Sequence, residues 1–177
     1  MHHLRSTLPD ATISVEVEKP HREGLHELAS EADVVFFSRV WAEAQGYNSS
    51  KTFLEAMGKS LKEQRSSSPP FQLTSTIDVV HSPTLFCTWG AQGSRAWHRG
   101  IIEHAKPLTT DIKVIDPVGA GDSFIAGVLF VMALQHGNNA AKALRLGISV
   151  AETKVQREGF QGFSPAQEQA SQTRWLA

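Results

Sequence analysis

The chain has 177 residues, of which 41% are hydrophobic and 20% charged, and its formal net charge at pH 7 is −1. This composition is typical of a globular domain with one core, and the small net charge gives no reason to expect nucleic acid or a membrane as a partner. Cys87 is the single cysteine, which rules out an internal disulfide within the chain, and its apolar neighbours favour a buried small hydrophobe over a reactive thiol.

No segment of the sequence indicates a targeting signal, a membrane span or a metal site. The most apolar run, 125–134, is too short to cross a bilayer, and the first residues contain no apolar core of a secretion signal. The eight histidines are scattered without the spacing of a zinc site. We therefore expect a cytoplasmic protein that has no metal ligands of its own.

The first half of the chain shows strand and helix patterns in turn. Apolar and polar residues alternate over 12–18, which predicts a strand, and the apolar run 33–39 is typical of a strand covered on both faces. Helices are predicted at 21–31, with Leu25 and Leu28 facing inward, at 41–46 for one turn, and at 51–65 after a serine cap.

The second half continues the alternation after a polar connection at 66–82, which is expected to be a surface loop, with a short strand at 77–80 as the alternative. A buried strand is predicted at 84–89, and a glycine turn should lead into a hairpin strand at 94–99. Another short strand should end at Val114–Ile115. The remaining predicted elements are a helix from about Asp122 or Ser123, a helix at 139–156 and a final helix at 165–175.

Alternating strands and helices predict an α/β fold with a mainly parallel sheet and helices on both faces. Ligands of such sheets bind outside the carboxyl ends of the strands. The glycine turns at 90–93 and 119–121 both follow predicted strands and should lie at such ends. We therefore expect the functional site to form from these two turns.

The turn before the helix at 122–134 has the features of a phosphate site. Asp116-Pro117 stops the preceding strand, because proline cannot donate to a sheet ladder. Gly119 and Gly121 permit tight backbone conformations and leave N–H groups uncovered at the positive end of a helix dipole. The alternative for such glycines is a tight turn that serves only helix–sheet packing.

Two common phosphate-binding motifs do not fit the sequence. The dinucleotide motif G-x-G-x-x-G fails because Phe124 stands at the third glycine position. Gly58-Lys59-Ser60 imitates the end of a Walker loop, but the first glycine of that motif would fall at Phe53. We interpret 58–60 as part of an amphipathic helix.

Residues 116–124, D-P-V-G-A-G-D-S-F, resemble the second signature of the PfkB, or ribokinase-like, sugar kinases, D-T-x-G-A-G-D-x-F, with Pro117 in place of threonine. Weaker likenesses at 13–20, 32–39, 87–93 and 143–163 follow the order found in the ketohexokinase (fructokinase) branch of that family. The resemblance implies a ribokinase-like fold. It also implies that residues 1–177 form a single partial carbohydrate kinase domain, and the likeness is strongest over 12–163.

The resemblance implies ATP-dependent phosphorylation of a sugar, with a ketose such as fructose as the expected substrate. It makes Asp122 the catalytic base and the backbone of Gly119, Ala120 and Gly121 the anion hole. It further implies ATP with Mg²⁺, a possible monovalent cation and a possible homodimer. The implied nucleotide-binding residues are Gly90, Ala91, Gln92, Gly93, Gly119, Ala120, Gly121, Asp122 and Gly147. For Gly90–Gly93 a plain hairpin turn, and for Gly147 ordinary helix packing, remain alternatives.

The resemblance covers only the C-terminal half of such a kinase, without the first glycine signature and the lid sheet that carries most sugar contacts. We therefore expect the chain to be incomplete and inactive alone. The alternatives are a non-catalytic nucleotide-binding or interaction remnant and a ribokinase-like kinase for another small molecule, such as a nucleoside or vitamin precursor. The genomic sequence upstream of Met1 would discriminate between an incomplete and a shortened protein.

Overall fold

The computed structural model describes residues 7–8, 10–67, 82–134 and 139–160. Contacts divide the chain into two compact units, the first made of 1–90 with 95–103 and the second of 91–94 with 104–177. The predicted final helix and nearly all of the polar connection at 66–82 lie outside the described residues. None of the helices in the described ranges combines the length and the hydropathy that a membrane span requires.

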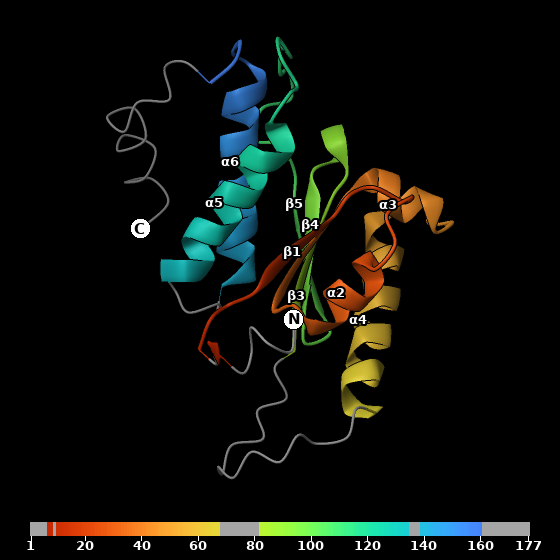
Figure 1. Ribbon diagram of the computed structural model, residues 1–177. Coiled ribbons are helices and arrows are strands. Elements are labelled where there is room, and N and C mark those ends of the chain that lie inside the picture. Colours follow the sequence, from red (N-terminus) through yellow and green to blue (C-terminus); the bar gives the residue numbers. More distant parts are fainter. Residues whose placement is uncertain (1–6, 9, 68–81, 135–138, 161–177) are drawn as a thin grey trace. The chain divides into compact units, whose positions relative to one another are not determined.

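Within these described residues, five strands form one sheet in the order β1-β2-β3-β4-β5 (Figure 1). The parallel part consists of β1 (Ser14–Val17), β2 (Val34–Phe37) and β3 (Thr84–Thr88), with Val15 opposite Val35 and Val35 opposite Leu85. All four residues of β2 are buried, as the continuous apolar run predicts. These three strands confirm the strands predicted within 12–18, 33–39 and 84–89.

Two hairpins extend the sheet through β4 (Ser94–His98) and β5 (Ile101–Ala105). The connections are far too short for a parallel crossover, so both strands run antiparallel to their predecessors. A hydrogen bond of 2.9 Å between Thr84 Oγ1 and His98 Nδ1 joins the start of β3 to the end of β4. Arg99 and Gly100 both have positive φ, as a two-residue hairpin turn requires. The sequence predicted β4 but not β5, whose residues are mostly exposed and show no clear alternation.

The first unit buries one core between the sheet and its helices α2 (Leu25–Glu31), α3 (Arg39–Ala44) and α4 (Ser50–Ser67), which lie together on one face of the sheet (Figure 1). The predicted apolar stripe of α4 is confirmed, whereas Leu28 is 39% exposed and the prediction that it faces inward is wrong. In α2 the buried positions are Leu25 and Ala29, one helical turn apart, so Leu28 lies beside the core. The core of the first unit contains Val17, Val35, Phe37, Trp41, Phe53, Leu54, Met57, Leu61, Leu85 and Cys87.

Two residues singled out in the sequence have packing roles in this core. A Cβ on Gly58 would lie 2.3 Å from Cε2 of Trp97, so this glycine lets α4 pack against the indole of β4. Residues 58–60 are therefore part of a helix, as the sequence analysis interpreted them, and do not form a phosphate-binding loop. Cys87 is buried, as predicted, and this burial raises the pKa of its thiol to about 12, which disfavours the reactive thiolate.

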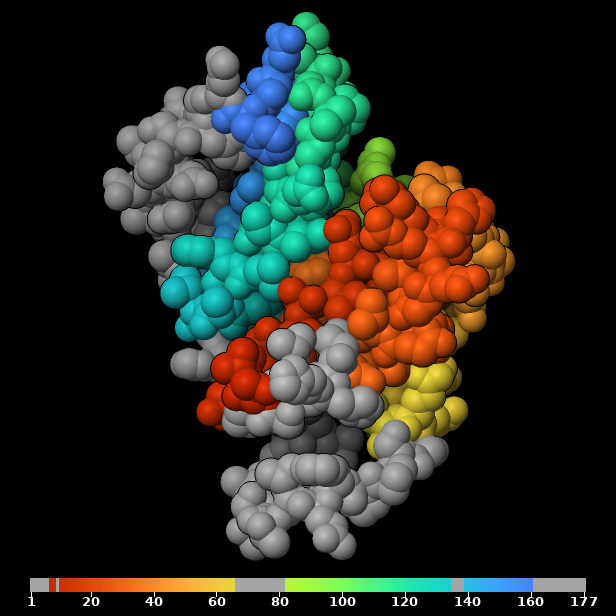
Figure 2. Space-filling model, in the orientation of Figure 1, coloured from red at the N-terminus to blue at the C-terminus, as the bar shows by residue number. Residues whose placement is uncertain are grey.

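The second unit contains α5 (Ala120–Leu134) and α6 (Ala140–Val155), which run side by side (Figure 1). Asn139 caps α6 by accepting a hydrogen bond of 2.9 Å from the Lys142 N–H, so the predicted helix at 139–156 is confirmed. The helices approach closely at Gly127 and Gly147, where a Cβ on Gly127 would lie 2.9 Å from the Gly147 Cα. One side of α5 is buried, and the space-filling view shows its other side on the visible surface (Figure 2).

This close approach makes Gly127 intolerant of substitution. We expect Gly127→Ala to lower the free energy of unfolding by about 1–3 kcal/mol, because the added methyl group overlaps the backbone of Gly147, which cannot move aside as a flexible side chain can. Gly121→Ala is the matched control in the same helix, since a Cβ there meets nothing within 4 Å. Urea denaturation of both variants measures the effect, and equal stability of the two would contradict the packing role of Gly127.

Candidate active site

The segment that leads into α5 is tied to the end of α6. The N–H groups of Ile115 and Asp116 both donate to the carbonyl oxygen of Val155, at 2.7 and 3.1 Å. The predicted strand that ends at Val114–Ile115 is therefore wrong: these side chains are 57% and 54% exposed, and the segment is irregular. A strand needs a neighbouring strand for its ladder, and here the last turn of a helix accepts the hydrogen bonds instead.

A tight turn at Pro117–Ala120 starts α5. The N–H of Ala120 donates to the Pro117 carbonyl at 3.2 Å, and that of Ser123 donates to the Gly119 carbonyl at 2.9 Å. The helix thus begins at Ala120, earlier than the predicted start at Asp122 or Ser123. Gly119 has φ +78°, and a Cβ there would lie 2.3 Å from Cζ of Phe160. Both the backbone angle and the packed ring require glycine at position 119.

The first turn of α5 presents an open anion-binding surface. Gly121 and Asp122 are exposed, and a Cβ on Gly121 would meet no atom within 4 Å. Within the described ranges, the N–H groups of these two residues have no hydrogen-bond partner. Free N–H groups and the positive end of the helix dipole favour a negatively charged ligand at this point.

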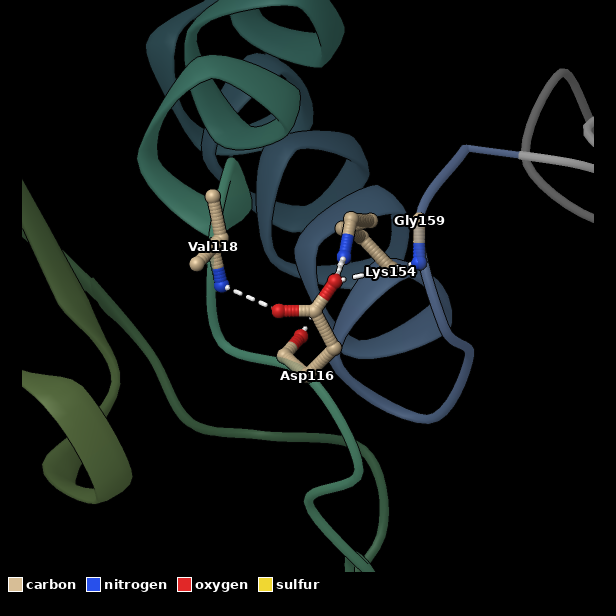
Figure 3. Close-up of polar contacts among 4 residues, drawn as sticks. All are labelled: Asp116, Val118, Lys154 and Gly159. Carbon is tan, nitrogen blue, oxygen red and sulfur yellow. Dashed lines mark hydrogen bonds and ion pairs between the residues drawn. The ribbon is translucent and has the colours of Figure 1, made fainter.

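Asp116 holds this loop in place through both carboxylate oxygens (Figure 3). Its Oδ1 accepts from the Val118 N–H at 2.9 Å, and its Oδ2 accepts from the Gly159 N–H at 3.1 Å. Lys154, a fully buried residue of α6, donates its ammonium to Oδ2 at 2.8 Å and to the Asp116 carbonyl oxygen at 3.2 Å. The sequence analysis did not identify Lys154 and Gly159 as the partners of Asp116.

The Lys154 ammonium and two backbone N–H groups lower the pKa of Asp116 from its usual 3.8 to about 2. Because the folded state favours the ionised carboxylate, Asp116 stabilises the fold above pH 3.8, and this contribution is lost as the pH falls through about 2. We expect the stability difference between wild type and Asp116→Asn to shrink over this range. Urea midpoints of both proteins from about pH 5 to pH 2 test this, and a constant difference would contradict it.

The glycine turn before β4 is a short 3₁₀ segment, η1 (Gly90–Gln92), in which Ala91 and Gln92 are exposed. The following Gly93 has φ +87°, and a Cβ there would lie 2.1 Å from the Ala105 carbonyl oxygen. His104 Nε2 lies 3.1 Å from the Gln92 carbonyl oxygen. The turn is therefore held against the end of β5, and the nucleotide contacts predicted for Gly90–Gly93 stay a prediction.

The structure gives Gly147 a packing role and leaves its predicted nucleotide contact untested. A Cβ on Gly147 would lie 2.8 Å from both Phe124 Cδ2 and Val128 Cγ2 of α5. The structure thus places Gly119 in the turn before α5, Ala120, Gly121 and Asp122 in the first turn of that helix, and Gly147 at the helix crossing. In the described part of the chain, no three His, Cys, Asp or Glu side chains are close enough to hold a metal ion.

Comparison with known proteins gives one consistent result. The family model described as pfkB family carbohydrate kinase matches residues 17–167. Ketohexokinase from Mus musculus is 32% identical over 163 residues, which cover 91% of this chain and 47% of the mouse protein. The chain therefore spans about half the length of this curated relative.

Solved structures of sugar kinases share the fold of the chain. Ribokinase from Giardia lamblia matches with a TM-score of 0.68 at 18% identity, covering 97% of this chain and 53% of the ribokinase. A Vibrio cholerae fructokinase structure with bound fructose, ADP and calcium ion matches with a TM-score of 0.60 at 19% identity, covering 84% of this chain and 46% of that one. The predicted ribokinase-like fold is confirmed.

Proposed function

The chain belongs to the pfkB family of carbohydrate kinases, and from this premise we propose that it supplies the phosphate-binding loop and the catalytic base of an ATP-dependent sugar kinase. The observation that carries the proposal is the first turn of α5, where two backbone N–H groups that have no partner among the described residues lie beside an exposed carboxylate. That combination suits phosphoryl transfer to a hydroxyl, because the carboxylate can accept the proton of the hydroxyl while the N–H groups stabilise the charge on the phosphoryl oxygens.

The backbone of Gly119, Ala120 and Gly121 serves as the anion hole in this mechanism. Phosphoryl transfer depends on positioning and on stabilising the charge of the phosphoryl oxygens, which fixed N–H donors and a helix dipole provide without reorganisation. The Ala120 N–H closes the turn at 3.2 Å, a long hydrogen bond that a phosphate oxygen can displace. The open space at Gly121 lets the phosphate approach the backbone.

Asp122 acts as the base that takes the proton of the sugar hydroxyl. It follows the anion hole in the same helical turn, so one substrate can place its hydroxyl at the carboxylate and face the phosphoryl group. Within the described residues, the Asp122 side chain makes no hydrogen bond or ion pair that would compete for the proton. The base therefore needs no rearrangement before it acts.

The proposed substrates are ATP and a ketose such as fructose. The mouse relative is a ketohexokinase, and the Vibrio cholerae structure holds fructose and ADP with a calcium ion. Asp122 lies in the first turn of α5, and no three His, Cys, Asp or Glu side chains among the described residues are close enough to hold a metal ion; this suits Mg²⁺ carried largely by the nucleotide phosphates and water. The cytoplasmic location and the homodimer also stay predictions.

Two alternatives remain open because the chain spans about half of its relative. The first is a nucleotide-binding or interaction remnant without an acceptor site, which would bind ADP but transfer no phosphate. The second is a ribokinase-like kinase for another small molecule, favoured by the fold match to ribokinase. ADP release that depends on fructose would identify a ketose kinase. ADP release that depends only on another acceptor would favour the second alternative, and no acceptor-dependent release would favour the first.

The experiment that tests the proposal is a coupled ADP assay with ATP, Mg²⁺ and fructose. We expect the 177-residue chain alone to read near background, because a hydroxyl reacts only when positioned side chains hold it at the base. A longer chain with the segments that its relatives have in addition should turn over. Other sugars and nucleosides serve as controls for specificity. Fructose-dependent ADP release by the short chain, lost in Asp122→Asn, would contradict the expected inactivity.

A further inference from the structure

Lys154 is buried at a cost that packing alone does not explain. Its side chain is fully buried within α6, and taking an ammonium out of water is unfavourable unless ion pairs and hydrogen bonds compensate. An apolar residue of similar size often stabilises such a position equally well. The lysine at this position is better explained by what its charge holds in place.

The charge of Lys154 is directed at the residue that shapes the anion loop. Its ammonium contacts the carboxylate of Asp116 at 2.8 Å and the Asp116 carbonyl oxygen at 3.2 Å, and it lies 5.1 Å from the centre of the Phe160 ring. The same ring packs on Gly119, since a Cβ there would lie 2.3 Å from its Cζ. Lys154 is therefore linked to the loop through Asp116, which precedes the turn, and through Phe160, which packs on Gly119.

The contacts of Asp116 transmit this charge to the start of α5. The carboxylate that Lys154 holds also accepts from the Val118 N–H at 2.9 Å, which fixes the residue before Gly119 (Figure 3). Without the ammonium, the carboxylate, already 23% exposed, would gain by turning toward water and would release this N–H. The N–H groups at 119–122 would then spend less time in the arrangement that receives a phosphate.

We infer that Lys154 is a positioning residue for nucleotide phosphate, whose buried ammonium, through Asp116, holds the backbone N–H groups of Gly119–Asp122 in their anion-binding arrangement. This inference rests on the proposed function, and it adds a residue outside the signature motif to the site. Lys154 touches neither nucleotide nor sugar in this account. It sets the fraction of molecules whose loop is ready to bind.

The test measures the affinity of ADP for the 177-residue chain by calorimetry. Lys154→Met, which keeps the length of the side chain without its charge, should raise the dissociation constant of ADP about tenfold or more, because the binding-competent fraction of the loop falls. Glu152→Met is the matched control on the same helix. Glu152 is also buried, and it accepts from the N–H groups of Leu108 and Thr109 at 2.6 and 3.2 Å, so its loss disturbs a different loop.

Chemical rescue separates the charge of Lys154 from its volume. In Lys154→Ala, propylammonium should restore ADP affinity, whereas propanol of similar size should not. Equal rescue by both compounds would show that Lys154 only fills space and would overturn the inference. If Lys154→Met does not fold, the double variant Lys154→Met/Asp116→Asn removes both charges of the pair, and it should show the same loss of ADP affinity.

The outcomes distinguish this inference from the proposed function. ADP binding by wild type that is unchanged in Lys154→Met would overturn the role of Lys154 and leave the nucleotide site intact. No ADP binding by wild type would overturn the proposed function, and the role of Lys154 would fall with it. A loss of affinity in Lys154→Met that Glu152→Met does not share, together with selective rescue by propylammonium, would support the inference.

Discussion

Asp122→Asn should lower the turnover of an active, longer version of this protein by about 10²–10⁴, the usual contribution of a positioned general base. The amide keeps the size of the side chain and its place in the first turn of α5, but it cannot take the proton of the sugar hydroxyl. ADP affinity should change much less, because the phosphate contacts are assigned to the backbone. Steady-state kinetics and calorimetry measure the two effects separately.

Asp111→Asn is the matched control for this prediction. Asp111 is also exposed in the second unit, outside the turn that starts α5, so its amide variant should keep both turnover and ADP affinity. Turnover of Asp122→Asn within a few-fold of wild type would remove Asp122 from the role of base. A parallel loss of turnover and ADP affinity would instead assign Asp122 to phosphate binding.

Gly121→Val should leave the chain folded and weaken ADP binding by about 10–100-fold, the loss expected when one or two hydrogen bonds to a charged group are blocked. The fold should survive because the Cβ at this position meets no atom within 4 Å, and Gly121, unlike Gly119, has no positive φ. The branched side chain would instead occupy the space through which a phosphate reaches the N–H groups. Turnover of the longer protein should fall together with the affinity.

Ala126→Val provides the matched control, since it adds the same branched side chain at another exposed position of α5. Both variants should unfold at similar urea concentrations, and only Gly121→Val should lose ADP affinity. A Gly121→Val protein that binds ADP normally would show that the glycine has no part in phosphate binding.

Much of the fold and the centre of the site could be predicted from the sequence, because their signals are local. The continuous apolar run of β2 and the apolar stripe of α4 depend on residues that are neighbours in sequence. The signature at 116–124 likewise placed its glycines and Asp122 in one loop. The family and the ribokinase-like fold inferred from it are confirmed.

The errors arose where pairing between distant segments decides the structure. Val114 and Ile115 have high strand propensity, but a strand also needs a neighbouring strand that accepts its hydrogen bonds. Here the carbonyl oxygen of Val155, in a helix, accepts the hydrogen bond of Ile115 instead. The role of Lys154 was missed because Asp116 lies 38 positions away in sequence. A lysine on the apolar side of α6 was the available signal, since a buried cation requires a partner.

The central claim is that the turn that starts α5 binds nucleotide phosphate, and the backbone amide signals of Gly119, Gly121 and Asp122 test it most directly. In a titration of the isotope-labelled 177-residue chain with ADP, followed by nuclear magnetic resonance, these signals should shift most and in proportion to bound ADP. Inorganic phosphate should shift the same signals at higher concentration. ADP binding that leaves these three amides unchanged, or no binding at all, would contradict the claim.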